Sequence, residues 1–363
     1  MKLKVKKDDL LAGLQRVQPA VAARTTLPVL GNILVRADAE RVQLTASDLA
    51  MTVTASMPAE VAKAGATTVP AKRLSAIARE TAGSEIELEC NEREVTTLRS
   101  ASAVFHLNGI AAEDFPALPK IADARTFTME REILRSMLQR TSYAASADES
   151  RQVLNGVLLA FRDGRLTVVA TDGRRLAMVE QEVEMTKEAA ELIVPTKAVS
   201  EIILMLDGQG PVTLNAMANL LAVDAGETVL YSRLVEGTFP NYRQVIPGQC
   251  EERIALERES FMNAVRRVAL LTSETNNAVK LTIGRNKIDI TAQTPDVGEA
   301  KESVPVKYSG KEIAVSFNPA FITDPLKNLV ADQVYLEFND ETSPGVIKTD
   351  EPFLYVIMPM RMS

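Results

Sequence analysis

The sequence predicts an α+β protein that repeats one fold three times, each copy with two helices on one side of antiparallel sheets. Three observations support this: the length of 363 residues, motifs that recur about 120 residues apart, and apolar periodicity that alternates between helical and strand-like. An apolar content of 46% is ordinary for a globular chain with several cores. The expected domains are 1–122, 123–247 and 248–363.

The repeat is clearest between the first two copies. Leu30–Val35 (LGNILV) returns as Leu154–Leu159 (LNGVLL) after 124 residues. The segment 46–48 (ASD) returns as 170–172 (ATD) after the same interval, and 279–283 is a fainter third copy of the first motif. A period of this length is too long for a solenoid and indicates a triplicated domain.

Six segments are expected to be helices because apolar residues recur in them every three to four positions. They are 6–24, 71–80, 129–142, 196–206, 257–272 and 319–330. Alternation of apolar and polar residues predicts half-buried antiparallel strands. These strands are 41–45, 51–57, 85–90, 94–98, 165–169, 212–214 and 287–291. Pro325 lies inside the last helical segment and is expected to kink or shorten it.

Positive charge is concentrated in the expected helices. The whole chain has a net charge of −7, yet the six helical segments together hold +6, which leaves −13 for the rest. If each copy places its helices on a common side, that side is mildly basic and the sheets are acidic. A weakly basic face suits a polyanion that is touched through few contacts, which gives mobile, sequence-independent binding. The alternative is that these cations are solvated surface residues without a partner.

The composition argues against several kinds of chemistry. Two cysteines and one histidine form no metal-ligand cluster and no C-x-x-C pair, and neither common glycine-rich phosphate-binding motif is present. Cys90 is expected to be a small core residue and His106 a surface residue. Asp48 and Asp172 are equivalent by repeat and belong to separate copies, so we expect them not to share a catalytic site; Asp172, in Thr-Asp-Gly, is expected to shape a turn. We expect no catalytic residues, no cofactor and no metal.

The expected location is cytoplasmic. No apolar run approaches the ~18–20 residues that a membrane-spanning helix needs. The first residues, Met1–Asp9, have no long apolar stretch after their lysines, as a secretory leader would.

Several motifs together resemble the bacterial DNA polymerase III beta subunit family, the sliding clamps. They are Thr26–Asn32, Val169–Ala177, Gly237–Tyr242 and Tyr355–Arg361, and the resemblance covers the whole chain. It implies a non-catalytic processivity factor in DNA replication, a head-to-tail homodimer that closes a ring around double-stranded DNA without regard to sequence. Helices would line the hole. An ATP-dependent clamp loader, the DNA polymerase III alpha subunit, and other clamp-binding polymerases and repair proteins would be its partners.

The resemblance also implies three sets of site residues. A partner-peptide pocket between the second and third domains would contain Leu154, Thr171, Gly173, Arg175, Leu176, Pro240, Val245, Val356, Met358, Pro359, Met360 and Arg361. Arg24, Lys72, Arg73 and Lys197 would face DNA, and the subunit interface would bring Phe105 and Leu107 against Leu270 and Leu271. Methionines beside leucine and valine form adaptable apolar surfaces for short peptides, and arginine would add a polar anchor.

The residues alone leave other interpretations open. The tail could be a last strand that closes a core, the four interface residues could be core, and each cation could be an ordinary surface residue. Gln244 stands where the family often has arginine, and Asp148 stands where a glutamine approaches DNA. Two other classes of function remain: a protein-interaction scaffold without DNA encirclement, and an enzyme.

Overall fold

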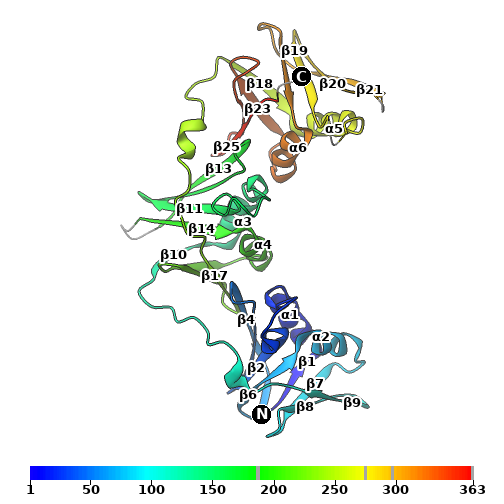
Figure 1. Ribbon diagram of the computed structural model, residues 1–363, viewed down its shortest axis with the longest axis vertical. Coiled ribbons are helices and arrows are strands. Elements are labelled where there is room, and N and C mark those ends of the chain that lie inside the picture. The colour runs from blue at the N-terminus through cyan, green and yellow to red at the C-terminus, as the bar shows by residue number, and fades with distance from the viewer. Residues whose placement is uncertain (185–188, 274–275, 296–297, 361–363) are drawn as a thin grey trace. The chain divides into compact units, whose positions relative to one another are not determined.

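The computed structural model describes residues 1–184, 189–273, 276–295 and 298–360, and contacts divide the chain into two compact units (Figure 1). Unit 1 contains Met1–Glu132 and Ser200–Leu234, and unit 2 contains Ile133–Val199 and Val235–Ser363. The middle third of the chain therefore contributes to both units. The expected boundaries near residues 122 and 248 follow the sequence repeat and stay predictions.

Unit 1 is built on an antiparallel sheet of eight strands, in the order β10-β15-β16-β17-β4-β3-β2-β6, and a second of five, β5-β1-β7-β8-β9. The strands are β1 (Lys2–Lys6), β2 (Asn32–Asp38), β3 (Arg41–Ser47), β4 (Met51–Pro58), β5 (Glu60–Lys63), β6 (Gly65–Pro70), β7 (Glu85–Cys90), β8 (Val95–Ser100), β9 (Ala103–Asn108), β10 (Arg125–Glu130), β15 (Pro211–Ala216), β16 (Leu220–Asp224) and β17 (Thr228–Arg233). Helices α1 (Lys7–Val17) and α2 (Ala71–Glu80) bury Leu10, Leu14 and Leu74.

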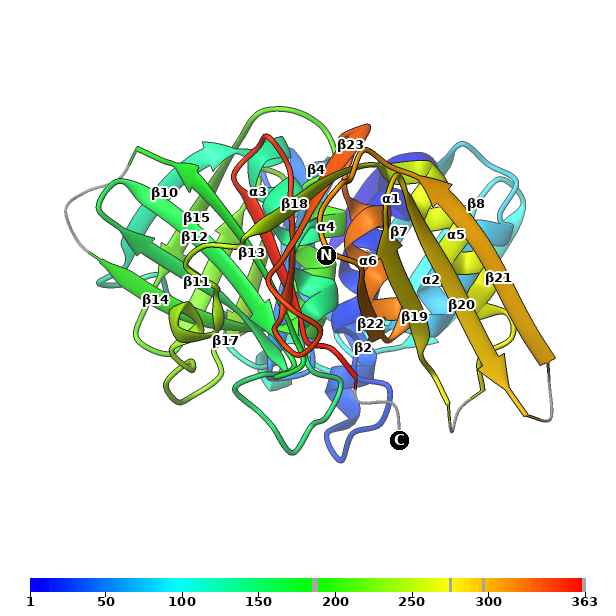
Figure 2. The same ribbon diagram turned by 90° about the horizontal axis from the view of Figure 1, so that it is seen from above.

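Unit 2 repeats this plan with an eight-stranded sheet, β14-β11-β12-β13-β25-β24-β23-β18, and a four-stranded one, β21-β20-β19-β22. Figure 2 shows β19, β20 and β21 side by side, with β21 outermost. The strands are β11 (Gly156–Arg162), β12 (Arg165–Thr171), β13 (Arg175–Glu182), β14 (Ala190–Pro195), β18 (Glu252–Glu257), β19 (Val279–Gly284), β20 (Lys287–Thr294), β21 (Gly298–Pro305), β22 (Ile313–Phe317), β23 (Gln333–Phe338), β24 (Gly345–Lys348) and β25 (Phe353–Ile357). The helices are α3 (Arg131–Gln139), whose first two residues belong to unit 1, α4 (Thr196–Met205), which ends in unit 1, α5 (Arg258–Ala269) and α6 (Pro319–Asn328).

Each of the six expected helical segments contains one of these helices. The segment 71–80 is helical over its whole length, whereas α1 ends at Val17 and a 3-10 turn (Gln18–Ala20) containing Pro19 follows it. Helix α6 runs through Pro325 and ends at Asn328, two residues before the end of the expected segment.

The two eight-stranded sheets join the repeats in the same way. In unit 1, β4 pairs with β17 and Met51 lies opposite Ser232. In unit 2, β13 pairs with β25 and Arg175, 124 residues after Met51, lies opposite Ile357. Each of these junctions is a continuous antiparallel ladder, so strands of two repeats share one hydrogen-bonded sheet.

The turns that precede these junctions confirm the expected role of Asp172 and show the same arrangement at its repeat equivalent, Asp48. Asp48 Oδ1 accepts the backbone N–H groups of Ala50 (3.0 Å) and Met51 (2.7 Å). Asp172 Oδ1 accepts those of Arg174 (2.8 Å) and Arg175 (3.0 Å). Both aspartates therefore organise turns, as short polar side chains commonly do.

The first residue of one helix in each repeat is a cation that binds main-chain carbonyls. Lys7 Nζ donates to the carbonyl of Arg79 (3.1 Å) near the end of α2, and Arg258 Nη1 donates to that of Leu326 (2.9 Å) in α6. Arg131 Nε and Nη2 likewise donate to two carbonyls. Cations are favourable near helix C-termini, where carbonyls lack helical partners, which explains Lys7 and Arg258. The two carbonyls that Arg131 binds belong instead to Pro211, the first residue of β15, and Ala225, just after β16. Three of the charges counted in the helical segments thus stabilise the fold.

Two smaller expectations have opposite outcomes. Cys90 is half-buried rather than core, because it ends β7 and its Sγ lies 3.4 Å from the Asn91 carbonyl. His106 is exposed on β9, as expected, with its Nδ1 3.1 Å from the Thr97 hydroxyl. Within the described residues, no helix is long and apolar enough to cross a membrane, and no group of three or more potential ligands could hold a metal ion.

Candidate functional site

The predicted pocket residues of unit 2 gather around the ladder between β13 and β25. Leu176 lies opposite Val356, and both are buried in a cluster that includes Leu158, Val169 and Phe239. Strand β25, which ends at Ile357, therefore closes a core, as the alternative interpretation of the tail predicted.

Beyond β25 the tail is held in place through its main chain. The Met358 N–H donates to the Arg174 carbonyl (2.9 Å), and the Met360 N–H donates to the Ser316 carbonyl (2.7 Å). With the backbone fixed, the Met358 side chain is 41% exposed, and that of Met360 is similarly exposed. Arg361 lies outside the described residues.

A second segment adds an exposed apolar side chain beside the same cluster. Tyr242 and Ile246 pack against the cluster, and Val245 between them is exposed at the end of a 3-10 turn, Tyr242–Val245. We call these three exposed residues, Val245, Met358 and Met360, the tail patch: Val245 lies between two residues that pack on the cluster, and the methionines follow β25. Exposed apolar side chains can mark an interaction surface.

The turn between β12 and β13 contains Arg174, which accepts the Met358 N–H, and it is held by its own hydrogen bonds. The Thr171 hydroxyl donates to the Arg175 carbonyl (2.6 Å) and accepts the Gly173 N–H (3.1 Å). Gly173 has φ of +86°, in the left-handed region that favours glycine. Among the other predicted residues, Leu154 is half-buried, Pro240 is exposed after buried Phe239, and Pro359 is partly buried.

The Arg175 side chain is largely buried and is held by hydrogen bonds within unit 2. Its side chain is 11% exposed, and it donates from Nε to Asp172 (3.0 Å), from Nη1 to Asp324 (2.7 Å) and from Nη2 to the Tyr143 carbonyl (2.7 Å). Its guanidinium carbon also lies 4.4 Å from the centre of the Phe321 ring. Burial alone would lower the pKa of Arg175, but the hydrogen bond to Asp324 and the nearby negative charges raise it above its usual range.

Tyr355 explains why α6 tolerates Pro325. In a regular helix the N–H of residue 325 would donate to the carbonyl of Phe321, but proline has no N–H. The hydroxyl of fully buried Tyr355 donates to this carbonyl instead, at 2.7 Å. Burial raises the pKa of Tyr355, so the hydroxyl stays protonated and can donate. The tail strand and α6 are therefore joined by a side-chain hydrogen bond.

The two residues that depart from the family pattern are both at the surface. Gln244 is exposed within the 3-10 turn, and its N–H lies 3.3 Å from the Asn241 carbonyl. Asp148 accepts the N–H (3.0 Å) and hydroxyl (2.6 Å) of Ser150, and these bonds lower the pKa of its carboxyl. Asp148 therefore organises its own loop.

The remaining predicted residues lie apart in the chain. Arg24, Lys72 and Arg73 are exposed in unit 1, and Lys197 is exposed in α4. Half-buried Phe105 and Leu107 lie on β9 of unit 1, whereas Leu270 and Leu271 follow α5 in unit 2. Leu270 is 77% exposed, so the core interpretation is wrong for this residue.

Sequence comparisons agree over the full length. The N-terminal, central and C-terminal domain families of the DNA polymerase III beta subunit match residues 1–119, 128–241 and 243–361. The chain is 36% identical to the beta sliding clamp of Chlamydia muridarum, with 100% of this chain and 99% of that protein covered. It is 33% identical to the beta sliding clamp of Escherichia coli K12, with both chains fully covered.

Solved structures give the same result. The DNA polymerase sliding clamp from Bacillus subtilis superposes with a TM-score of 0.96 at 28% identity. The sliding clamp from Pseudomonas aeruginosa, crystallised with griselimycin bound, has a TM-score of 0.96 at 30% identity, and both comparisons cover all of each chain. Three repeated α+β domains of this kind define a sliding clamp. The chain belongs to the bacterial DNA polymerase III beta subunit family, the beta sliding clamps.

We predict that Tyr355 and Pro325 are energetically coupled. Tyr355→Phe should lower the free energy of unfolding by about 1–3 kcal/mol, because it leaves the buried Phe321 carbonyl without a donor. In a Pro325→Ala background the restored N–H can donate to that carbonyl, so the same change should cost at least ~1 kcal/mol less. Denaturant unfolding of the four variants measures the coupling. Tyr335→Phe is the matched control, because its hydroxyl bonds Gln333 at the surface. An equal loss in both backgrounds would contradict the role of Tyr355.

Proposed function

We propose that two copies of this chain join head to tail in a closed ring that encircles duplex DNA and tethers the replicative polymerase to it. The main support for this proposal is that all three domains match beta sliding clamps over the full length of the chain. Tethering raises the effective concentration of a polymerase at its primer end, so that it rebinds rather than diffuses away. The ring is a processivity factor without catalytic activity of its own, and an ATP-dependent loader supplies the energy of loading.

Two edge strands support a head-to-tail interface. β9 ends the five-stranded sheet of unit 1, and β21 ends the four-stranded sheet of unit 2. An edge strand presents unpaired main-chain groups and is a template for pairing with another chain. Phe105 and Leu107 lie on β9, and exposed Leu270 follows the helix that packs on β21. We infer that β9 of one copy meets β21 of the next, with these apolar side chains between them.

Exposed cations support contact with DNA through the phosphate backbone. Arg24, Lys72 and Arg73 are solvent-exposed on one unit, and Lys197 is exposed on α4. Each neutralised phosphate adds about 0.9 to the salt dependence of binding, so a handful of contacts hold DNA weakly. Weak contacts fit a ring that holds DNA by topology and moves along it.

The tail patch supports the binding of partner peptides. Methionine side chains are flexible and polarizable, so a patch that contains Met358 and Met360 can adapt to different apolar sequences. We propose that short segments of the DNA polymerase III alpha subunit, the clamp loader and repair proteins bind here. In this proposal Arg175 positions the strands and α6 under the patch.

Retention on DNA tests encirclement. The chain is loaded by a matched clamp loader with ATP on a nicked circle and on the same circle cut once, at moderate salt. We expect retention on the circle and loss from the cut form. Equal loss, with loading verified by a control clamp, would favour a protein scaffold without DNA encirclement. Equal retention would mean that the protein grips DNA directly.

The interface predicts a monomeric variant. Leu270→Asp should give a folded monomer, because burying an unpaired carboxylate costs about 3–5 kcal/mol. This cost lowers dimer affinity at least about a hundredfold. Sedimentation measures the oligomeric state, and Val330→Asp is the control because Val330 is apolar and 93% exposed in the same unit. A Leu270→Asp variant that stays dimeric at the same concentration would refute this interface.

The tail patch predicts loss of ligand binding after one substitution. Griselimycin is a suitable probe because it is bound in crystal structures of the clamps from Pseudomonas aeruginosa and Bartonella birtlesii. We expect Met358→Lys to weaken its binding to this chain at least tenfold, since a cation replaces an apolar contact, while Val330→Lys has no effect. Calorimetric titration measures both. If Met358→Lys bound griselimycin with unchanged affinity, the assignment of the tail patch as its binding site would be wrong.

A further inference from the structure

The two edge strands of the proposed interface correspond to strands that already form a junction twice within the chain. In unit 1, Val53 of β4 lies opposite Leu230 of β17, and in unit 2, Ala177 of β13 lies opposite Tyr355 of β25. By repeat, β21 corresponds to β4 and β13, and β9 corresponds to β17 and β25. Each of these two strands ends its sheet in the described residues, so their free edges are the two halves of a third junction.

Pairing within the third repeat identifies Ala300 as the counterpart of Ala177. The hairpins β11–β12 and β19–β20 have the same register after a shift of 122 residues, so Ala292 corresponds to Ala170. Ala170 lies opposite Ala177 on β13, and Ala292 lies opposite Ala300 on β21. Ala300 therefore occupies the place at the third junction that Ala177 occupies in unit 2.

Pairing across the first repeat identifies Phe105 as the counterpart of Leu230 and Tyr355. In every repeat, a row of four opposed residues begins four positions before the cation that starts α1, α3 or α5. The rows are Leu3, Leu88, Leu98 and Phe105 in the first repeat, Phe127, Leu214, Val223 and Leu230 in the second, and Ile254, Leu336, Ile347 and Tyr355 in the third. Phe105 therefore ends its row at the place where the other two residues form the internal junctions.

We propose that two copies of the chain join at β9 and β21 in the register of the internal junctions, an assignment that rests on the proposed ring. Phe105 of one copy then lies opposite Ala300 of the next, and His106 lies opposite Glu299. His106 and Glu299 form an ion pair when the imidazole is protonated. The pair adds a charge contact between the two copies to an interface that is otherwise apolar.

The main-chain groups of the two edges support this register. The Gly109 N–H donates to the Glu94 carbonyl (2.8 Å), so by the alternation of an antiparallel ladder His106 turns its N–H and C=O away from β8. The Val306 N–H donates to a carbonyl in the turn before β20 (3.2 Å), so by the same alternation Glu299 turns its groups away from β20. Both residues can therefore bond across the interface, whereas a shift by one residue would set bonded groups opposite free ones.

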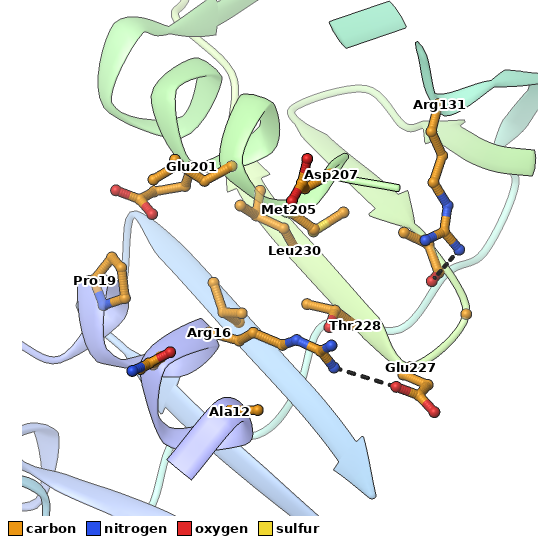
Figure 3. A pocket seen from close by; sticks show the side chains of 15 residues that line it. Ala12, Arg16, Pro19, Arg131, Glu201, Met205, Asp207, Glu227, Thr228 and Leu230 are labelled. Atoms are coloured by element: carbon orange, nitrogen blue, oxygen red, sulfur yellow. Dashed lines mark hydrogen bonds and ion pairs between the residues drawn. The ribbon is translucent and has the colours of Figure 1, made fainter. Parts of the chain in front are cut away.

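Side-chain size supports the same register. In unit 1 the junction residue Leu230 lines an open groove of about 660 Å³ (Figure 3), whereas in unit 2 Tyr355 lies opposite Ala177 and is fully buried. Phe105 and Ala300 again set an aromatic ring opposite an alanine. Phe105 is half-buried in the single chain, so the second copy covers apolar surface that is still exposed.

The groups that face His106 in its own copy are a hydroxyl and a paired cation. The His106 Nδ1 lies 3.1 Å from the Thr97 hydroxyl, which donates or accepts and so suits either protonation state. Arg99 lies diagonally across on β8 and pairs with Glu89 (3.0 Å). Glu94, just before β8, accepts a threonine hydroxyl of β6 (2.6 Å).

In the next copy, Glu299 is the carboxylate opposite His106. Lys301 lies diagonally across on the same strand and pairs with Asp289 of β20 (3.5 Å). Arg99 and Lys301 are thus both bound to carboxylates, which reduces their repulsion of an imidazolium. Histidine commonly changes its protonation between about pH 5 and pH 8. The ion pair is therefore present at the acid end of this range and is lost as the pH rises.

A double-mutant cycle on the full-length chain tests the ion pair. Energy transfer between labelled copies measures the dissociation constant of the dimer for the unaltered chain, His106→Gln, Glu299→Gln and the variant with both changes. At about pH 6 each single change should weaken the dimer about threefold or more, because a ring of two copies contains the pair twice, and the double variant should be no weaker. At about pH 8 the coupling should vanish. Glu341→Gln, at an exposed position of the same unit, is the control and should have no effect.

Disulfide formation tests the register separately from the charge. In a Cys90→Ser, Cys250→Ser background, His106→Cys with Glu299→Cys should cross-link the dimer, because opposed residues have the Cα separation of ~4.4–6.8 Å that a disulfide needs. His106→Cys with Lys301→Cys is the matched control and should cross-link more slowly, because diagonal residues lie ~7–8 Å apart.

Failure of the pair and failure of the ring give different results. A chain that dimerises but shows no coupling at about pH 6, equal coupling at about pH 8, or faster cross-linking of the control pair would overturn the assignment while the ring stands. A chain that stays monomeric at both pH values would refute the ring and the pair together.

Discussion

Unit 2 depends on one buried charge, the guanidinium of Arg175. It holds together the start of β13, the segment around Tyr143 and helix α6, and its partner Asp324 lies 149 residues further along the chain. A buried arginine is stable only when carboxylates and carbonyls satisfy its donors, and three of its nitrogens do so here. Tyr355 adds a second link between β25 and α6. The main chain that leads to Met358 and Met360 is therefore fixed by hydrogen bonds, while both residues remain exposed.

The triplicated fold keeps its frame and varies what fills it. Lys7, Arg131 and Arg258 each begin a helix and bind main-chain carbonyls. The junctions β4–β17 and β13–β25 share their register. The space above these junctions differs because aromatic side chains and an arginine fill it in unit 2, whereas smaller residues leave a groove in unit 1. Interior packing is dense in proteins, so smaller side chains at these positions leave a groove.

Charge has two roles in this chain. Some helix cations are structural, as the three first-residue cations show, and others, such as Lys72 and Arg73, are exposed. The net charge of −7 therefore does not describe how the cations are used, because some are bound to carbonyls of the fold and others lie at the surface. The apolar surface is likewise divided between side chains that close cores, such as Val356, and side chains that stay open, such as Leu270 and Met358.

The sequence by itself determined the local structure and the repeat. Apolar periodicity placed the six helices found in the described residues, the 124-residue shift related β4 to β13, and the Thr-Asp-Gly segment predicted the turn at Asp172. These features depend on residues that are close in the chain, so short-range patterns report them. Family motifs pointed to the tail and to Arg175 as pocket residues, but they did not indicate the hydrogen bonds that hold Arg175 within unit 2.

Only the tertiary structure decided which side chains are buried and which groups they contact or bind through hydrogen bonds. Tyr143, Phe321 and Asp324 surround Arg175 from distant segments, and no local pattern pairs them. Helix α6 continues through Pro325 because the Tyr355 hydroxyl, 34 residues from Phe321, donates the hydrogen bond that proline cannot. Leu270 is exposed, although it was interpreted as a core residue. It follows the end of α5, and a sequence pattern does not show whether another element covers that end. Such contacts arise from long-range packing, which a sequence pattern does not specify.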